Sequence, residues 1–273
     1  MPTTYAHYKF GKDVLGALPR PLQQSIENNR ELFDIGLHGP DIFFYYRVFS
    51  KNHVNQYGYQ MHDAFADEFF LHAADVIRKA KDKGAARAYI YGFICHFALD
   101  SECHKYVEKM MQVSGMSHSE IEMEFDRMLM KDDFLNPLSH LPSKHLHPTL
   151  KNAEVIAQFF EGITAEETKK TLSYMRICLR LLLPQREITR RTMLGALKVV
   201  GQQDSMGKMI MSKEANPACE EYSKILKKQY AGAVPLAAGL ILQYQKVLFD
   251  HAELPNRFHE TFGAGEHWEE LCL

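Results

Sequence analysis

Residues 89–104 read YIYGFICHFALDSECH and carry the strongest local signal in the sequence. Its apolar first part predicts a helix that is buried on most sides. His96, Asp100 and His104 follow at intervals of four, so a helix places their side chains one above another on one face. Two imidazoles and a carboxylate inside a protein need polar partners, because an unpaired buried charge is costly. A divalent cation satisfies all three at once, and hydrogen-bonded pairs within a helix core are the alternative interpretation.

Helical periodicity continues outward from this stretch in both directions. Apolar residues recur at intervals of three or four, no segment alternates with the period of a strand, and no repeat of fixed length is present. Ser117 with Glu120 and Thr164 with Glu167 have the spacing of capping boxes. The prediction is an all-α protein with helices over residues 13–29 (broken or bent at Pro19 and Pro21), 60–81, 85–111, 117–130, 152–161, 165–183, 187–201, 217–229 and 234–251.

Other segments predict helix ends and irregular structure. Lys83-Gly84 has the composition of a helix end, and Pro40 fits the first turn of a helix. Residues 136–148 contain three prolines and three histidines and read as a loop. The end of the chain is rich in glycine, glutamate and histidine and is expected to be loosely ordered. We expect a metal-binding helical core over residues 1–135, a helical region over 150–255 that packs on this core, and a tail over 256–273.

Charge and composition argue against several classes of function. The 273 residues include 32 Lys and Arg against 34 Asp and Glu, a formal net charge of −2, which argues against a large basic surface for duplex nucleic acid. No apolar run predicts a membrane span, and the N-terminus has no secretory signal. Five scattered cysteines are typical of reduced thiols in a cytoplasm. No GxSxG or P-loop motif supports a serine hydrolase or a nucleotide hydrolase.

The distribution of histidine points to a metal site. Eleven of the 14 histidines lie in residues 1–150, among many carboxylates, which is the composition that a hydrolytic zinc site needs. His118 and Glu122 are one helical turn apart and can converge on one ion, although a solvated helix face gives the same pattern. His7, Asp41 and His62 stand alone in the sequence, and for each an ordinary structural role is the alternative.

Together these residues resemble the motifs of the zinc-dependent phospholipase C family, whose all-helical fold and metal core are shared with single-strand-specific zinc nucleases. The resemblance covers residues 5–130. It implies a multi-helix bundle of that type, with additional helices at the C-terminus. The order H-x3-D followed by H-x3-E is the more specific part, and the remaining positions support it. The matching residues are His7 in AHYKFG, Asp41 in GPDIFFYY, His62 in YQMH, His96 and Asp100 in HFALD, His104, and His118 and Glu122 in HSEIE.

The resemblance implies a site for two to three zinc ions, and iron or manganese would also accept these nitrogen and oxygen ligands. Asp100 would be shared, with one oxygen for each of two ions. The first ion would take Asp41, His62, His96 and Asp100; the second His104, His118 and Glu122; the third His7, Asp100 and the N-terminal residue.

The implied activity is the hydrolysis of phosphoesters by a metal-activated water that Asp41 orients or deprotonates, as in a phospholipase C-like phosphodiesterase. The expected partner is a small-molecule or lipid-derived phosphoester. Aromatic residues near the implied ligands are core residues or the walls of a substrate pocket. Two alternatives remain: a non-catalytic helical metal-binding or scaffold protein that retains the metal core, and a nuclease built on the same core. The aromatic residues are Phe43, Phe44, Tyr45, Tyr46, Tyr57 and Tyr59.

Two features depart from the family pattern. Secreted members offer an N-terminal tryptophan to the metal, whereas this chain begins Met1-Pro2, so the third site is expected to be incomplete or empty. The gap between Asp100 and His104 is shorter than in the secreted phospholipases. It keeps His104 on the helix of Asp100, and the geometry of the second ion is expected to differ.

Less is predicted for residues outside the motifs. Glu102 or Asp63 is a candidate to hold the ligand imidazoles from behind. In the C-terminal half, Arg186, Arg190 and Arg191 form a small basic cluster, for which a solvated helix end and a phosphate contact are the two interpretations.

Overall fold

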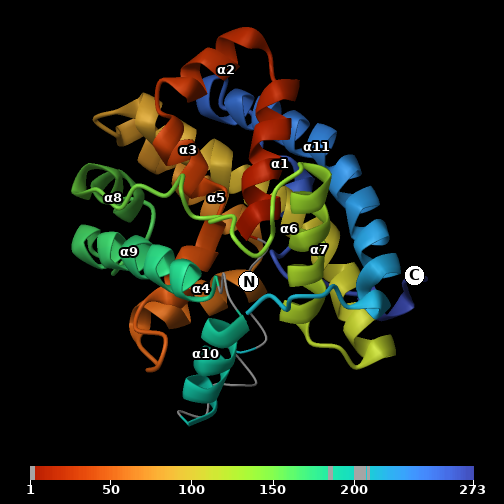
Figure 1. Ribbon diagram of the computed structural model, residues 1–273. Helices are drawn as coiled ribbons and strands as arrows, with labels where there is room; N and C mark the ends of the chain where they lie inside the picture. Colours follow the sequence, from red (N-terminus) through yellow and green to blue (C-terminus); the bar gives the residue numbers. More distant parts are fainter. Residues whose placement is uncertain (1–3, 184–186, 200–206, 208–209) are drawn as a thin grey trace.

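The computed structural model describes residues 4–183, 187–199, 207 and 210–273, and these residues form helices and no strand (Figure 1). The all-α prediction is confirmed. The α-helices are α1 (Thr4–Ala17), α2 (Arg20–Glu27), α3 (Arg30–Gly36), α4 (His53–Asp63), α5 (Ala66–Lys79), α6 (Lys83–Ser114), α7 (His118–Asp132), α8 (Leu150–Ala157), α9 (Ala165–Leu181), α10 (Glu187–Val199) and α11 (Glu220–Phe249), and the short 3-10 helices are η1 (Gly39–Tyr45), η3 (Pro217–Cys219), η4 (Asn256–Phe258) and η5 (Trp268–Glu270).

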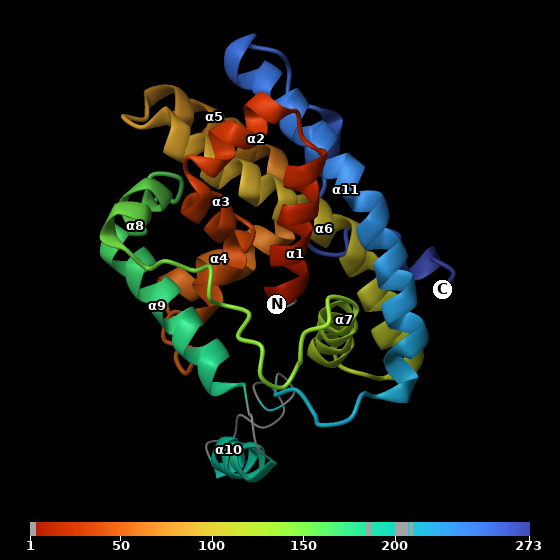
Figure 2. The ribbon, with the colours of Figure 1, turned by 45° about the horizontal axis from the view of Figure 1, so that its top comes forward.

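The long helix α6 is the centre of the molecule, and α1, α3, α7 and α11 pack around it (Figure 2). Its apolar first half is buried, as the sequence predicted. Two glycines allow α3 to cross α6 closely, because a Cβ on Gly36 would lie 2.1 Å from the carbonyl oxygen of Tyr89, and a Cβ on Gly92 would lie 2.1 Å from that of Phe33. This crossing holds the segment after α3, which contains Asp41, over the polar face of α6.

The single helix predicted for residues 60–81 is wrong. Helix α4 ends at Asp63, and α5 begins at Ala66. The break is stabilised from the far end of the chain, because the amide of Ala66 donates to the carbonyl of Glu260 and the amide of Gly263 donates to the carbonyl of His62. Local amphipathic periodicity carries no information about these partners.

Other predicted helix boundaries also differ. The helix predicted for residues 13–29 is two helices, because α1 begins earlier, at Thr4, and ends at Ala17, and α2 begins at Arg20, directly after Pro19. Lys83 and Gly84 begin α6 instead of ending a helix, and the side chain of Asp82 caps this start by accepting from the amide of Ala85. Ser117 precedes α7 but makes no side-chain cap, and the Glu120 carboxylate accepts a hydrogen bond from Asn216 in place of the predicted capping box.

Other boundary predictions hold. Thr164 and Glu167 form the predicted capping box at the start of α9. Pro40 lies in the first turn of η1, as expected. Residues 136–148 contain turns and no helix, and α10 ends at Val199, while the last predicted residues of that helix lie outside the described residues.

The two helices predicted for residues 217–229 and 234–251 are one helix, α11, with Pro235 inside it. Proline removes a backbone hydrogen bond and is costly within a helix. Packing of α11 along α6, α1 and α7 holds the two halves in line. By length and composition the segment Pro217–Phe249 is able to cross a membrane, although core helices pass the same test and 44% of its most apolar window is buried.

The tail is not loosely ordered as expected. Phe258 and Phe262 are buried at 0% and 1% exposure, and they belong to the same apolar cluster as Phe10, Phe93 and Tyr244. That cluster therefore joins α1, α6, α11 and the end of the chain. The predicted division into segments 1–135, 150–255 and 256–273 stays a prediction.

Candidate metal centre

The predicted ligands come from five elements and meet on one face of α6. His7 lies on α1, Asp41 on η1 and His62 on α4, and the remaining five lie on α6 and α7. Within each of three groups, two of which share His96, one donor atom per residue lies within 4.8 Å of the others. The groups are His7, His96 and Asp100; Asp41, His62 and His96; and His104, His118 and Glu122.

Asp100 is at the centre of this arrangement and divides its two oxygens between neighbours. Oδ1 lies 3.1 Å from Nε2 of His7, and Oδ2 lies 3.0 Å from Nε2 of His96 and 3.8 Å from Nε2 of His62. The two oxygens therefore face different groups. This is the placement that a carboxylate shared by two ions requires.

In the group around Asp41, buried polar atoms lie close together without hydrogen bonding. Asp41 Oδ1 is 3.1 Å from His62 Nε2, yet neither atom has a hydrogen-bond partner among the described residues, and neither ring nitrogen of His96 has one. Unsatisfied buried polar atoms cost free energy. Two atoms bound to one tetrahedral zinc at about 2.0–2.1 Å lie about 3.3 Å apart, so these spacings fit a shared cation.

The group between α6 and α7 has similar spacing. Nε2 of His118 lies 3.1 Å and Nε2 of His104 lies 3.4 Å from Oε1 of Glu122. The short gap between Asp100 and His104 does keep His104 on α6, as predicted, and the helix still presents His104 to Glu122. Three donors of the types that zinc prefers therefore face one another here.

Carbonyls and a carboxylate contact these imidazoles from behind. Nδ1 of His104 lies 2.6 Å from the carbonyl oxygen of Phe262, and Nδ1 of His62 lies 3.1 Å from that of Gly58. A carbonyl only accepts, so Nδ1 carries the proton in both rings and Nε2 is left to bind a metal. Nδ1 of His118 lies 3.6 Å from the carboxylate of Glu108, an ion-pair distance.

The prediction that Glu102 or Asp63 holds the ligand imidazoles from behind is wrong. Glu102 accepts a hydrogen bond from Arg257, and Asp63 is exposed and contacts no ligand imidazole in the described part of the chain. Glu108 was predictable, because it lies four residues after His104 on the same helix. The carbonyl of Phe262 had no sequence signal.

Neighbouring charges shift the pKa values of a carboxylate and a histidine in the centre. Burial alone would raise the pKa of Asp100, but the imidazoles of His104, His96 and His7 hold that pKa well below its ordinary value. Burial lowers the pKa of His118, but the carboxylates of Glu122 and Glu108 outweigh this effect and raise it to about 9. The carboxylates are therefore ionised, and a metal ion has to displace a proton from His118.

A buried carboxylate on α7 positions His7. Oδ2 and Oδ1 of Asp126 accept hydrogen bonds from the amides of Tyr5 and Ala6 at 3.1 and 2.8 Å, which fixes the first turn of α1. Burial raises the pKa of Asp126 to about 7 even though these amides lower it. Met1 and Pro2, the expected source of a third-site ligand, lie outside the described residues.

Most of the aromatic residues near the ligands are core residues. Phe43, Tyr45 and Tyr46 are buried away from solvent. Phe44 stacks on Tyr59, whose ring is half exposed, and also contacts the ring of His62. This pair is the aromatic wall nearest to the centre.

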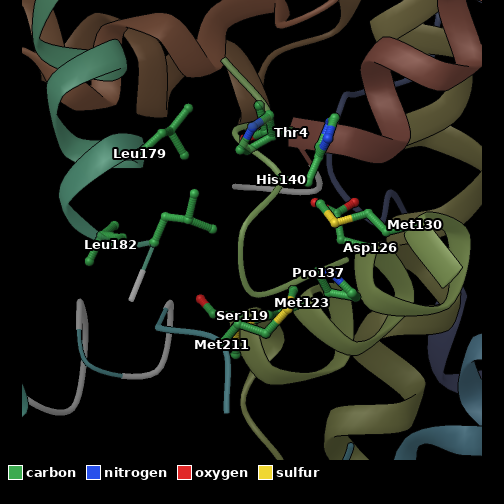
Figure 3. Close-up of a pocket in the computed structure, with 12 residues that line it drawn as sticks. Thr4, Ser119, Met123, Asp126, Met130, Pro137, His140, Leu179, Leu182 and Met211 are labelled. Atoms are coloured by element: carbon green, nitrogen blue, oxygen red, sulfur yellow. The ribbon is translucent and has the colours of Figure 1, made fainter. Parts of the chain in front are cut away.

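A separate pocket lies between α7, α9 and the loop after α7 (Figure 3). Its walls are mainly apolar, with Met123, Met130 and Leu179 among them, and it also contains Asp126 and His140. None of the eight predicted ligands lines it.

Comparison with known proteins gives one match. A family described as zinc dependent phospholipase C matches residues 6–173, more than half of the chain. No curated protein and no solved structure matches.

Proposed function

The chain belongs to the zinc-dependent phospholipase C family, and from this we propose that it is a metal-dependent hydrolase of phosphoesters, a phospholipase C-like phosphodiesterase. The observation that carries the proposal is the division of the two Asp100 oxygens between two groups of buried histidines. Nδ1 of His7, Nε2 of His62 and both ring nitrogens of His96 are buried and have no hydrogen-bond partner among the described residues. Two to three zinc ions would supply partners for the imidazole nitrogens that face Asp41 and Asp100.

We assign each group of neighbouring donor residues to one ion. Asp41, His62, His96 and Asp100 would hold one ion, and His7 with Asp100 would contribute to a neighbouring one. Zinc bound in such a site lowers the pKa of a coordinated water to near 7 and neutralises charge on phosphate oxygens. The third set would be His104, His118 and Glu122.

Exposure sets the direction from which a substrate arrives. The side chains of His118 and His62 are 27% and 15% exposed, whereas those of Asp41, His96 and Asp100 are at most 7% exposed. A phosphoester therefore reaches the centre past His62 and His118. Asp41 is the residue we assign to orient or deprotonate the attacking water.

The substrate we propose is a small-molecule or lipid-derived phosphodiester. The Phe44–Tyr59 pair stands beside His62, on the side of the centre that is open to solvent, and offers an aromatic surface to the group esterified to phosphate. All five cysteines are unpaired, which supports a reducing, cytoplasmic location.

Metal content and turnover, measured together, test the proposal. Untagged protein is expected to hold two to three equivalents of zinc and to hydrolyse a generic phosphodiester. A His96→Ala/Asp100→Ala variant should lose both, and His72→Ala, which alters an exposed histidine on α5, should lose neither. Metal without turnover of any phosphoester would leave the non-catalytic scaffold. Less than one equivalent, unchanged in the double variant, would refute the metal centre itself.

A further inference from the structure

Helix α10 stands apart from the rest of the molecule. In two views it lies beyond the C-terminal end of α9, and it has no other described helix to pack against over any length (Figures 1 and 2). Amphipathic helices in globular proteins normally bury their apolar side chains. The apolar residues of α10 therefore need another explanation.

One face of α10 is open to solvent along its length. Ile188 and Val199, at its two ends, are 75% and 88% exposed. Arg191 and Lys198 are exposed on the same face, because they follow the helical spacing that links the two apolar residues. Two basic side chains thus lie between the two apolar side chains on this face.

The C-terminal end of α9 repeats the pattern. Ile177 and Leu181, one turn apart, are 53% and 61% exposed, and each directly follows an exposed arginine, Arg176 or Arg180. The opposite face of α9 is already packed, because Leu179 lines the pocket of Figure 3. Ile177 and Leu181 are therefore apolar residues that the described fold does not use.

Positive charge is concentrated in the segment that contains α10 and most of α9. Residues 168–199 contain eight of the 32 Lys and Arg residues but one of the 34 Asp and Glu residues, namely Glu187. The rest of the chain has 24 basic against 33 acidic residues. No ion pair within the described residues neutralises Arg176, Arg180 or Lys198.

We propose that the exposed faces of α10 and of the C-terminal end of α9 dock on an anionic lipid surface. Basic side chains near such a surface are attracted to its headgroups, and apolar side chains between them enter the boundary of the acyl region. Each exposed apolar residue of this surface has a basic neighbour, as such a boundary requires. A protein partner is the alternative occupant, because arginine is common in protein interfaces, and vesicle binding separates the two.

Vesicle co-sedimentation tests the proposal with the full chain, and its result does not depend on whether the chain hydrolyses phosphoesters. Vesicles of phosphatidylcholine with about one third phosphatidylglycerol should bind the protein, with affinity falling as salt is raised, and vesicles of phosphatidylcholine alone should not. Arg176→Glu/Lys198→Glu should weaken binding by at least about 25-fold, at about fivefold or more per residue. Ile188→Asp/Val199→Asp should also reduce it.

Matched variants on other exposed sites serve as controls. Lys151→Glu/Lys228→Glu repeats the charge change, and Leu71→Asp/Val113→Asp repeats the apolar change. Both should bind vesicles as the wild type does, and circular dichroism should show all variants folded. Equal binding to both kinds of vesicle, or equal loss in the control variants, would overturn the proposal. So would variants that change self-association measured by sedimentation but not vesicle binding, since the surface would then join copies of the chain.

Discussion

Helices α6 and α10 break the ordinary rule of burial in opposite ways. Helix α6 buries Asp100 and two histidines at the centre of the molecule, and α10 leaves Ile188 and Val199 in water. Buried polar groups and exposed apolar groups are the informative exceptions in a folded chain. We infer that α6 keeps polar groups inside the protein because a metal binds there, and that α10 keeps apolar groups in water because a lipid surface binds there.

Asp100→Asn should give the largest effect, because it removes charge from two donor groups at once. We expect phosphoesterase activity to fall by at least about 100-fold. Metal content should drop to at most one equivalent, held by the His104 group. Elemental analysis and turnover on one preparation measure both. A variant that kept all of its metal would show that Asp100 is not shared.

Glycine substitutions test how closely the backbone is packed at the crossing of α3 and α6 and along α10. Gly36→Ala should lower the free energy of unfolding by about 2–3 kcal/mol, because its Cβ would lie 2.1 Å from the Tyr89 carbonyl oxygen. Gly195→Ala on α10 meets no atom within 4 Å and should be neutral or slightly stabilising, by less than about 1 kcal/mol. Denaturant unfolding of both variants checks this. Equal losses would mean that the close crossing of α3 on α6 does not constrain the fold.

The pH dependence of the metal-free protein tests the electrostatics of the α6–α7 face. The carboxylates of Glu122 and Glu108 raise the pKa of His118 in the folded state to about 9 from its ordinary value of about 6.5. Its ion pairs therefore stabilise the folded state fully below pH 6.5, and this contribution is lost as pH rises through 9. We expect a loss on the order of 2 kcal/mol.

Denaturant unfolding of chelator-treated protein at several pH values measures this loss. His118→Gln should remove the pH-dependent part between pH 6.5 and 9. Zinc affinity should show the opposite trend and increase over the same range, because metal and proton compete for the ring. A variant with the same pH profile as the wild type would contradict the assignment.

Arg257→Ala should give the smallest effect. Its guanidinium contacts Glu102 at 2.7 Å and Ser101 at 2.9 Å, which holds the tail on α6. Without it the carbonyl of Phe262 should orient His104 less firmly, and zinc affinity should fall about tenfold. Competition with a chromogenic chelator measures this affinity. An Arg257→Lys variant that recovers most of the affinity would support the tether, and unchanged affinity in Arg257→Ala would argue against it.

The helical class and the helix faces of several predicted ligands are readable from the sequence. Spacing along one helix is local, so it places His96, Asp100 and His104 on one face and His118 and Glu122 one turn apart, whereas their role as metal ligands stays a prediction. Features that depend on distant residues are not readable in this way. The break between α4 and α5 depends on Glu260, and the continuity of α11 across Pro235 depends on packing with α6.

The segment of Phe262 and Gly263 leaves the ribosome after the helices whose histidines it contacts. The carbonyl of Phe262 meets His104 across 158 residues, and the amide of Gly263 meets the carbonyl of His62. During synthesis, the histidines of α4 and α6 emerge long before the groups that orient them. We therefore expect tight metal binding only after Phe262 has emerged, and a chain cut short before Phe262 would carry all eight predicted ligands yet hold metal less firmly than a chain that contains it.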